Sequence, residues 1–241
     1  MKKVYFFCSL TWLVFLFMGC AKSNKTIIRQ QHFEEGVQSP TTVEELKNAI
    51  AKYQNRVADI QLAQAQIGIW YKILGTRYLD NKMYGEALKT FQKAIEYFPT
   101  NQNLYYYVGL CAGYMAHSAL DYDATASDTK KYNYLKLSES AYLEALRIEP
   151  RYARALYGLS ILYVFELDEN EKAVPLLEKL LTIETRNVDA MFVLARAYYS
   201  TYEFDKAAAV YDKIIQTTKS DERKKEAQAN KKIVLDAAYA K

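Results

Sequence analysis

The chain has 241 residues, 51% of them hydrophobic, with only 8 Gly and 4 Pro. This length is enough for one or two domains with a hydrophobic core, and the scarcity of turn-forming residues favours helices. There are 32 basic and 28 acidic residues, and two of the basic ones lie in the N-terminal segment, so the rest of the chain is nearly neutral. This balance argues against nucleic-acid binding, which needs a basic surface.

Residues 1–20 have the pattern of a secretory signal peptide. Lys2 and Lys3 precede an apolar run from Val4 to Gly19, which corresponds to the basic and hydrophobic regions of such a signal. As a helix the run would span about 24 Å, less than the roughly 30 Å core of a bilayer. The segment ends in "FMGC", which resembles a bacterial lipobox, and this implies that Cys20 is lipidated and becomes the first residue of the mature chain.

The lipobox resemblance also implies a location. We expect a protein of the bacterial cell envelope, lipid-anchored to a membrane and facing the periplasm; the alternatives are an uncleaved short anchor and ordinary secretion. Residues 21–40 have mixed charge, no sustained period and a closing proline, Pro40. They predict a flexible tether between the anchor and the folded part of the chain.

Helical signals begin directly after the tether. Thr42 and Glu45 have the spacing of a capping box, which predicts a helix that runs into the fifties. Residues 41–67 are therefore expected to form N-terminal packing helices. Further along, residues 85–99 read "GEALKTFQKAIEYFP". Ala87, Phe91 and Ala94 are four and three residues apart and share a helix face, so this helix is predicted to bury one side.

A second apolar stripe lies earlier in the chain, in residues 71–78, and the polar segment "DNKMYG" separates it from this helix. Two short amphipathic helices joined by a tight turn form an antiparallel hairpin. Over residues 68–101 the spacing resembles a tetratricopeptide repeat (TPR) at all eight signature positions. These positions are Tyr71, Leu74, Gly75, Tyr78, Ala87, Phe91, Ala94 and Pro99. The resemblance implies a right-handed superhelix of stacked hairpins, with the first helix of each hairpin lining a concave groove.

One hairpin cannot bury both of its faces, so further copies are expected. The pattern recurs from residue 102, from 153 to 187 and from 188 to 221, and the second copy carries an insertion near 117–135 between its helices. The predicted fold is therefore all-α, a solenoid of about four TPR hairpins over residues 68–221. Residues 222–241 predict a capping helix with one apolar side, formed by Ile233, Val234, Ala237 and Ala238.

The sequence offers little for catalysis. Only two histidines occur, His32 in the predicted tether and His117 near the insertion, so the sequence shows no recognisable histidine pair or Ser-His-Asp arrangement. Cys111 stands in an apolar helix and is predicted to pack in the core, without a disulfide partner. We therefore expect no enzyme, and neither a metal nor a cofactor.

Candidate binding residues follow from the geometry of the repeat, because certain positions of each first helix face away from its packed side. They are Lys72, Asn103, Tyr106, Arg154, Tyr157, Phe192, Arg196 and Tyr199. Aromatic side chains beside arginines suit an extended peptide or an anionic, partly apolar ligand. The alternative is that several of these side chains only pack against the neighbouring helix.

Two functions fit this sequence. The first is a membrane-anchored scaffold that binds a protein or peptide partner in the envelope. The alternative is a small-molecule-binding accessory component of a periplasmic transport system, with a closed cavity lined by Tyr106, Tyr157, Phe192 and Tyr199. An open groove would favour the scaffold and a closed apolar pocket the carrier. Self-association through the amphipathic segment 221–241 is a further hypothesis, although a simple cap explains that segment equally well.

Overall fold

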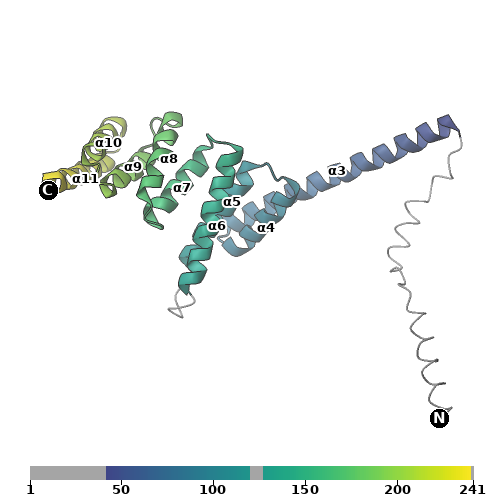
Figure 1. Cartoon of the computed structure of the whole chain (residues 1–241), viewed down its shortest axis with the longest axis horizontal. Helices are drawn as coiled ribbons and strands as arrows, with labels where there is room; N and C mark the ends of the chain where they lie inside the picture. The colour runs from purple at the N-terminus through teal and green to yellow at the C-terminus, as the bar shows by residue number, and fades with distance from the viewer. Residues whose placement is uncertain (1–41, 120–126, 240–241) are drawn as a thin grey trace, which may run out of the picture. The chain divides into compact units, whose positions relative to one another are not determined.

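The computed structural model describes residues 42–119 and 127–239, and within these residues every regular element is an α-helix (Figure 1). The proposed signal peptide and tether, residues 1–40, lie outside the described part. The helices are α3 (Val43–Asp80), α4 (Tyr84–Tyr97), α5 (Gln102–Ser118), α6 (Ser127–Ile148), α7 (Ala153–Phe165), α8 (Asn170–Ile183), α9 (Val188–Ser200), α10 (Phe204–Thr217) and α11 (Asp221–Tyr239). The chain divides into two compact units after Gln61.

The second unit, from Leu62 onward, is a stack of helix hairpins. Each helix from α4 to α11 packs against the next one along the chain. In addition, α5 contacts α7 and α7 contacts α9, so the first helices of successive hairpins lie beside one another. This is the arrangement of a helical solenoid, and it confirms the all-α fold that the sequence predicts.

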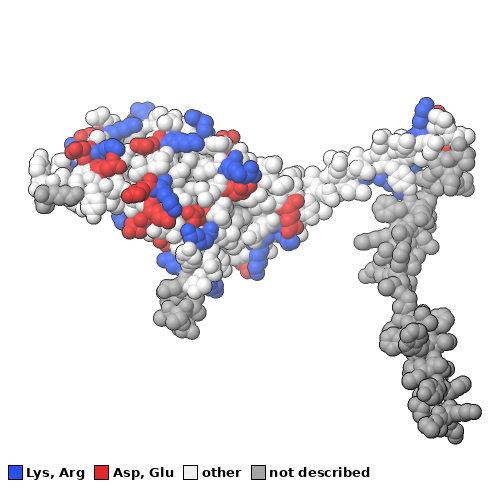
Figure 2. All heavy atoms as spheres, viewed as in Figure 1, with Lys and Arg blue, Asp and Glu red and all other residues white. Residues whose placement is uncertain are grey.

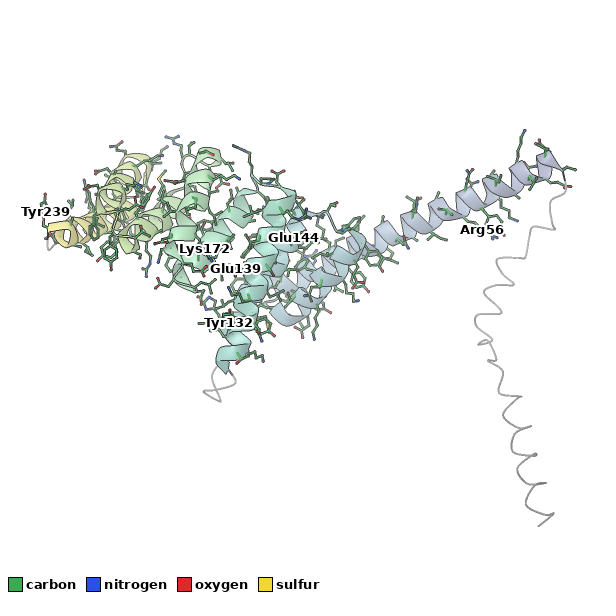
Figure 3. All side chains as sticks on the ribbon, viewed as in Figure 1. Arg56, Tyr132, Glu139, Glu144, Lys172 and Tyr239 are labelled. Carbon is green, nitrogen blue, oxygen red and sulfur yellow. The ribbon has the colours of Figure 1, made fainter. Side chains whose placement is uncertain are left out.

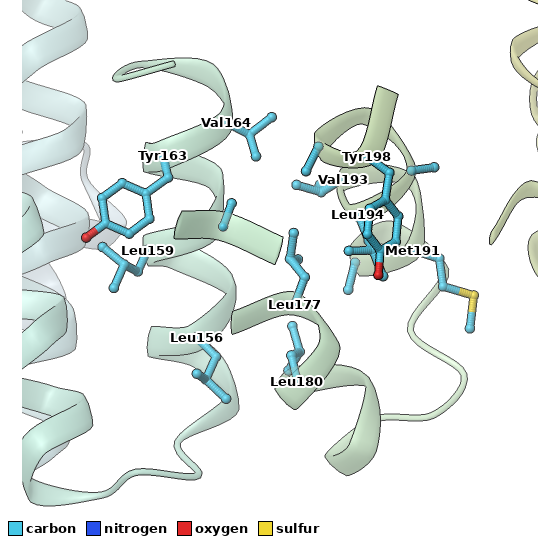
Figure 4. Close-up of a cluster of buried hydrophobic side chains, with 14 of the residues drawn as sticks. Leu156, Leu159, Tyr163, Val164, Leu177, Leu180, Met191, Val193, Leu194 and Tyr198 are labelled. Carbon is cyan, nitrogen blue, oxygen red and sulfur yellow. The ribbon is translucent and has the colours of Figure 1, made fainter. Parts of the chain in front are cut away.

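The same three positions of every second helix are buried, and they define the repeat. The first position is small: Ala87, Ser138, Ala173 and Ala207. The second is large: Phe91, Tyr142, Leu177 and Tyr211. The third is Ala94, Ala145, Leu180 and Ile214. Figure 4 shows Leu177 and Leu180 of α8 between the buried side chains of α7 and those of α9. The three-residue and four-residue spacing therefore places one continuous apolar face of each second helix in the core.

Glycines in the first helices allow the large ring of the second helix to come close. A Cβ atom at Gly75 would lie 2.8 Å from the ring of Phe91, and one at Gly109 would lie 2.8 Å from the ring of Tyr142. The Tyr142 ring also lies against the next first helix, where a Cβ atom at Gly158 would be 2.7 Å away. These distances are shorter than two carbon atoms tolerate, so the glycines are needed for close packing.

Two buried tyrosines connect successive hairpins. The hydroxyl of Tyr163 on α7 donates a hydrogen bond of 3.0 Å to Glu139 on α6, and Tyr198 on α9 donates one to Glu178 on α8. The charge of Lys172 helps to lower the pKa of Glu139, and the Lys172 ammonium nitrogen is 5.4 Å from the centre of the Tyr163 ring; Figure 3 labels both residues. Each bond joins the first helix of one hairpin to the second helix of the hairpin before it.

The insertion in the second hairpin lengthens its helices. Helix α5 has 17 residues and α6 has 22, whereas the helices from α7 to α10 have 13 or 14. Of the residues near 117–135 that the sequence assigned to the insertion, 127–135 form the start of α6, and Leu135 is buried. Residues 120–126 lie outside the described part of the chain.

The region before the first repeat differs from the expectation of separate packing helices. A single helix, α3, begins at the predicted capping box and continues through the first helix of the first repeat. The Glu45 amide donates to the Thr42 hydroxyl at 3.2 Å, and the Thr42 amide donates to the Glu45 carboxylate at 3.0 Å. Residues 43–67 contain neither Gly nor Pro and are rich in Ala and Gln, so nothing in them ends the helix.

Helix α11 covers the end of the stack. It packs against α10 with Ala227 and Val234 buried. The predicted apolar side was wrong for Ile233, which is 56% exposed, because the buried residues are seven apart and Ile233 lies to one side of them. Among the described helices we find none with the length and apolar character needed to cross a membrane.

Candidate binding clefts

One cleft lies at the C-terminal end of the stack, and we call it the C-terminal cleft. Its volume is about 330 Å³, and the end of α7, together with α9, α10 and α11, forms its walls. Its lining residues are Phe165, Phe192, Val193, Arg196, Tyr199, Tyr211, Glu226, Asn230, Ile233 and Val234. The walls are mostly aromatic and aliphatic, with one cation and one carboxylate among them.

Aromatic contacts shape the C-terminal cleft. The guanidinium of Arg196 lies over the ring of Phe165, 5.0 Å from its centre, which is a cation–π geometry. The rings of Phe192 and Tyr211 meet edge to face with their centres 6.1 Å apart. Phe165 itself is 48% exposed. A large apolar side chain and a guanidinium are thus presented together at an open surface.

The positive charge of Arg196 is available for a ligand. In the described part of the chain, Arg196 makes no ion pair with a carboxylate. Burial raises the pKa of the Tyr211 hydroxyl, which the charge of Arg196 partly offsets, so this tyrosine is neutral at physiological pH. The cleft therefore offers one guanidinium at its rim, and a carboxylate of a ligand could pair with it.

A smaller cleft, which we call the middle cleft, is formed by residues of α5, α6 and α7 and has a volume of about 190 Å³. Its lining residues are Leu110, Gly113, Tyr114, His117, Ser138, Tyr142, Gly158, Ile161, Leu162 and Glu166. Its polar groups have partners within the protein: His117 Nε2 is 3.1 Å from Glu166, and Lys131 Nζ is 3.4 Å from Glu166. The Ser138 hydroxyl donates to the Gly109 carbonyl at 2.8 Å.

Comparison with known proteins agrees with this architecture. Residues 165–230 match the family model described as "Tetratricopeptide repeat". The chain is 24% identical over 217 residues to the TPR repeat-containing protein of Borreliella burgdorferi, covering 88% of this chain and 92% of that protein. It is 27% identical over 96 residues to superkiller protein 3 of Schizosaccharomyces pombe, covering 40% of this chain but only 7% of that protein.

Solved structures have the same helical arrangement. A thermophilic TPR protein of Thermus thermophilus superimposes with a TM-score of 0.53 and 22% identity, over 68% of this chain and 79% of that one. YrrB, described as a TPR protein with an unusual peptide-binding site, gives 0.57 and 16%, over 70% and 76%. The fold is a tetratricopeptide-repeat solenoid. In a TPR solenoid the first helix of each hairpin lines the concave groove. Here the first helices α5 and α7 line the middle cleft, and α7, α9 and the capping helix α11 line the C-terminal cleft.

The structure brings three of the sequence-predicted residues together in the C-terminal cleft. These are Phe192, Arg196 and Tyr199, all from α9. Sequence reasoning missed Phe165, the last residue of α7, which follows the predicted groove residue Tyr157 by eight residues. Extending the groove positions of that helix by two turns would have found it. It also missed Ile233, whose exposure depends on how α11 packs.

Three other predicted residues meet in a different place, which we call the tyrosine cluster. The ring centre of Tyr106 is 5.9 Å from that of Tyr152, and the Tyr152 hydroxyl donates to Asn103 Oδ1 at 2.7 Å. Burial raises the pKa of Tyr106, and the charge of Arg154 nearby lowers it in part. Here the alternative reading of the sequence describes the structure better, because Asn103 and Tyr106 are engaged in packing between hairpins.

The last two predicted residues lie outside both clefts. Burial raises the pKa of Tyr157, and the nearby charge of Asp189 raises it further. Asp189 in turn pairs with Arg223 of α11 at 2.5 Å. Lys72 lies on α3, where its carbonyl accepts a hydrogen bond of 3.0 Å from the Thr76 hydroxyl. The eight candidates thus do not form one continuous surface.

Nucleophilic and metal-binding groups outside the clefts are few. Cys111 is fully buried, and burial raises the pKa of its thiol to about 12, so it is almost entirely protonated at neutral pH. Across residues 42–119 and 127–239, no group of three or more His, Cys, Asp or Glu side chains is placed to hold a metal ion.

Proposed function

We propose that this protein is a membrane-anchored TPR scaffold that binds an extended segment of a protein partner in the bacterial envelope through its C-terminal cleft. The observation that carries the proposal is the pair formed by Phe165 and Arg196, an exposed ring and a guanidinium without a carboxylate partner among the described residues, at an open cleft. Aromatic and arginine side chains are enriched at protein interfaces, and Trp, Tyr and Arg are enriched among the few residues that dominate the binding free energy. We assign the protein no catalytic role.

The chemistry of the cleft suggests the kind of segment bound. An aliphatic or aromatic side chain of the partner would pack against Phe165, Phe192 and Ile233. An acidic side chain or a C-terminal carboxylate beside it would pair with Arg196. Glu226 of α11, which also lines the cleft, would disfavour a second acidic group there, so the preferred segment is apolar with a single negative charge.

The N-terminal sequence supports the anchor. Two lysines, an apolar run and a tetrapeptide whose Gly19 and Cys20 fit the lipobox pattern resemble a lipoprotein signal. A fully extended tether of twenty residues could reach about 70 Å, so the cleft could meet partners well away from the membrane.

The carrier hypothesis is less well supported by the geometry. The four aromatic residues expected to line one closed cavity are distributed: Phe192 and Tyr199 belong to the C-terminal cleft, and Tyr106 belongs to the tyrosine cluster. Pockets for small molecules usually enclose about 300–1,000 Å³ and bury most of the ligand. The C-terminal cleft is at the lower end of this range, and Phe165 at its edge is half exposed.

Binding to a peptide array tests the cleft. The purified chain is expected to prefer peptides with one acidic residue next to an aliphatic or aromatic one, and Arg196→Glu should reverse this preference toward basic peptides. Lys213→Glu is the matched control, because this exposed residue of α10 lies outside the cleft. An unchanged preference in Arg196→Glu would contradict the proposal.

Mass spectrometry of the mature protein tests the anchor. We expect the first residue to be Cys20 carrying a diacylglyceryl group. An unmodified N-terminus, or one that still contains residues 1–19, would contradict lipid anchoring and leave the cleft proposal to be judged by the peptide experiment alone.

A further inference from the structure

The first part of α3 carries a heptad repeat. Apolar side chains recur at alternating intervals of three and four residues, and we call this set the heptad stripe. It consists of Val43, Leu46, Ile50, Tyr53, Val57, Ile60 and, after the polar Gln64, Ile67. These are the a and d positions of more than three consecutive heptads, which is the pattern of a coiled coil.

The heptad stripe lies on the surface. Five of its aliphatic side chains, those of Val43, Leu46, Ile50, Val57 and Ile60, are between 46% and 70% exposed. A row of large apolar side chains of this length on the surface marks an interaction site. Its period of 3.5 residues, rather than 3.6, follows a straight line only along a left-handed supercoil, so the matching partner is another helix with the same period.

We propose that the heptad stripe pairs with the heptad stripe of a second copy of this chain in a parallel, in-register coiled coil. A second copy supplies a helix of identical period and length. Register is set by Gln64, which occupies an a position. In the parallel pair the two Gln64 amides face each other and can hydrogen-bond, whereas in an antiparallel pair each would face a d residue such as Leu46 or Ile60 and lose its partner.

The flanking positions allow this pairing. In a parallel coiled coil each g residue faces the e residue five positions later on the other helix. These pairs are Ala49 with Gln54 and Arg56 with Gln61, so no like charges meet. The Arg56 guanidinium lies 5.5 Å from the centre of the Tyr53 ring on its own helix (Figure 3).

Four of the six charged residues of this region face away from the seam, and the other two, Lys47 at an e position and Arg56 at a g position, flank it. Glu44, Glu45, Lys52 and Asp59 occupy b and c positions, which face away from the partner helix. Figure 2 shows α3 largely without charged side chains on the visible face, whereas the solenoid surface carries interspersed positive and negative groups. A dimer joined in this way would present two C-terminal clefts, so that two-site binding to one partner would strengthen the interaction. The proposal does not depend on what the clefts bind.

Sedimentation of the full-length chain in mild detergent tests the proposal. The wild type is expected to have the mass of two chains, and Ile50→Glu with Val57→Glu should raise the dissociation constant at least about a hundredfold. Ala51→Glu with Ala58→Glu is the matched control, because it adds the same charge at b positions of the same two heptads and should leave the dimer intact. Circular dichroism should show a cooperatively unfolding helical solenoid in all three proteins, since every substituted side chain lies before the repeats and is exposed within one chain.

A monomeric wild type at every concentration would overturn the proposal, as would a dimer that survives the Ile50→Glu and Val57→Glu pair. Disulfide crosslinking tests the orientation in a full-length background with Cys8 and Cys20 replaced by serine. Val57→Cys should form a disulfide-linked dimer under mild oxidation, because facing a positions lie within disulfide reach. Asn55→Cys, at an outward f position, should not. Equal crosslinking at both sites, or none at residue 57, would refute the parallel pairing.

Discussion

Gly109 and Gly113 lie one turn apart on α5, and alanine should change the stability of the protein in opposite directions at the two sites. At Gly109 a Cβ atom would stand 2.8 Å from two ring carbons of Tyr142. At Gly113 the nearest atom would be the Ser138 hydroxyl oxygen at 3.8 Å, an ordinary contact. The two substitutions share the helix, the chemistry and the added methyl group, and differ only in what that methyl group meets.

The magnitudes decide the sign at each site. Replacing a helical glycine by alanine stabilises a protein by about 0.5–1 kcal/mol, because the unfolded chain loses freedom. Forcing an extra methyl group into a packed core costs about 1–3 kcal/mol. Tyr142 is 5% exposed, and Gly158 holds the other side of its ring, so the ring cannot move away. Gly109→Ala should therefore destabilise by up to about 2 kcal/mol, and Gly113→Ala should stabilise by about 0.5–1 kcal/mol.

Thermal and urea unfolding followed by circular dichroism would measure both effects. For a chain of this size, 1 kcal/mol corresponds to a change in Tm of about 2–4 °C. Tyr142→Leu should reduce the cost of Gly109→Ala in the double variant, because the side chain that clashes is gone. If Gly109→Ala and Gly113→Ala raise the Tm equally, the close approach of ring and glycine does not hold the hairpins together as the structure implies.

Three further predictions concern single side chains. Tyr198→Phe removes a hydrogen bond to Glu178 and should lower the free energy of unfolding in urea by about 1–2 kcal/mol. Tyr199→Phe, at an exposed ring, is the control and should change it by less than about 0.5 kcal/mol. Equal effects would refute the role of the Tyr198 hydroxyl in connecting the hairpins. Cys111, with its raised pKa, should not react with iodoacetamide at pH 8 until the protein unfolds. In a background with Cys8 and Cys20 replaced, intact-mass measurement would detect the labelling of Cys111. Rapid labelling of the folded chain would contradict its burial. Burial tends to raise the pKa of Glu139, but hydrogen bonds from Lys136 and Tyr163 outweigh this effect, so the pKa is lowered. The ionised Glu139 should therefore stabilise the fold above a pH of about 4.3, the ordinary glutamate pKa. This stabilisation should disappear as the pH falls through the lower pKa of the folded protein. The stability difference between wild type and Glu139→Gln should shrink over that range, and a difference that stays constant would refute the assignment.

Sequence periodicity predicts the hairpins because it records packing directly. A small residue, a large one and a third apolar residue at intervals of four and three specify which side of the second helix is buried, and Ala87, Phe91 and Ala94 are all fully buried. The register survives where identities change, as at Leu177 and Leu180. Each of these positions is determined by neighbours within the same hairpin or the next one, which is the range that a local pattern encodes.

One feature that sequence reasoning missed is local in the sequence, and the other depends on longer-range geometry. Separate helices are expected over residues 41–67, but residues 43–67 contain no stop signal and carry a continuous heptad pattern within α3. The C-terminal cleft combines Phe165 of α7 with Ile233 of α11, which are 68 residues apart in the chain. Their meeting depends on the superhelical path of the three intervening helices, α8, α9 and α10, and no motif in the sequence specifies that path.

Photo-crosslinking in intact cells tests the central claim most directly. A photoreactive phenylalanine analogue at position 199 would stand in the C-terminal cleft, and the same analogue at position 239 would stand on the exposed end of α11 (Figure 3). We predict that position 199 yields an adduct with one recurrent envelope protein through an extended segment, that position 239 does not, and that Phe165→Ala removes the adduct. Equal adducts from both positions, or an adduct that persists without Phe165, would contradict binding in this cleft.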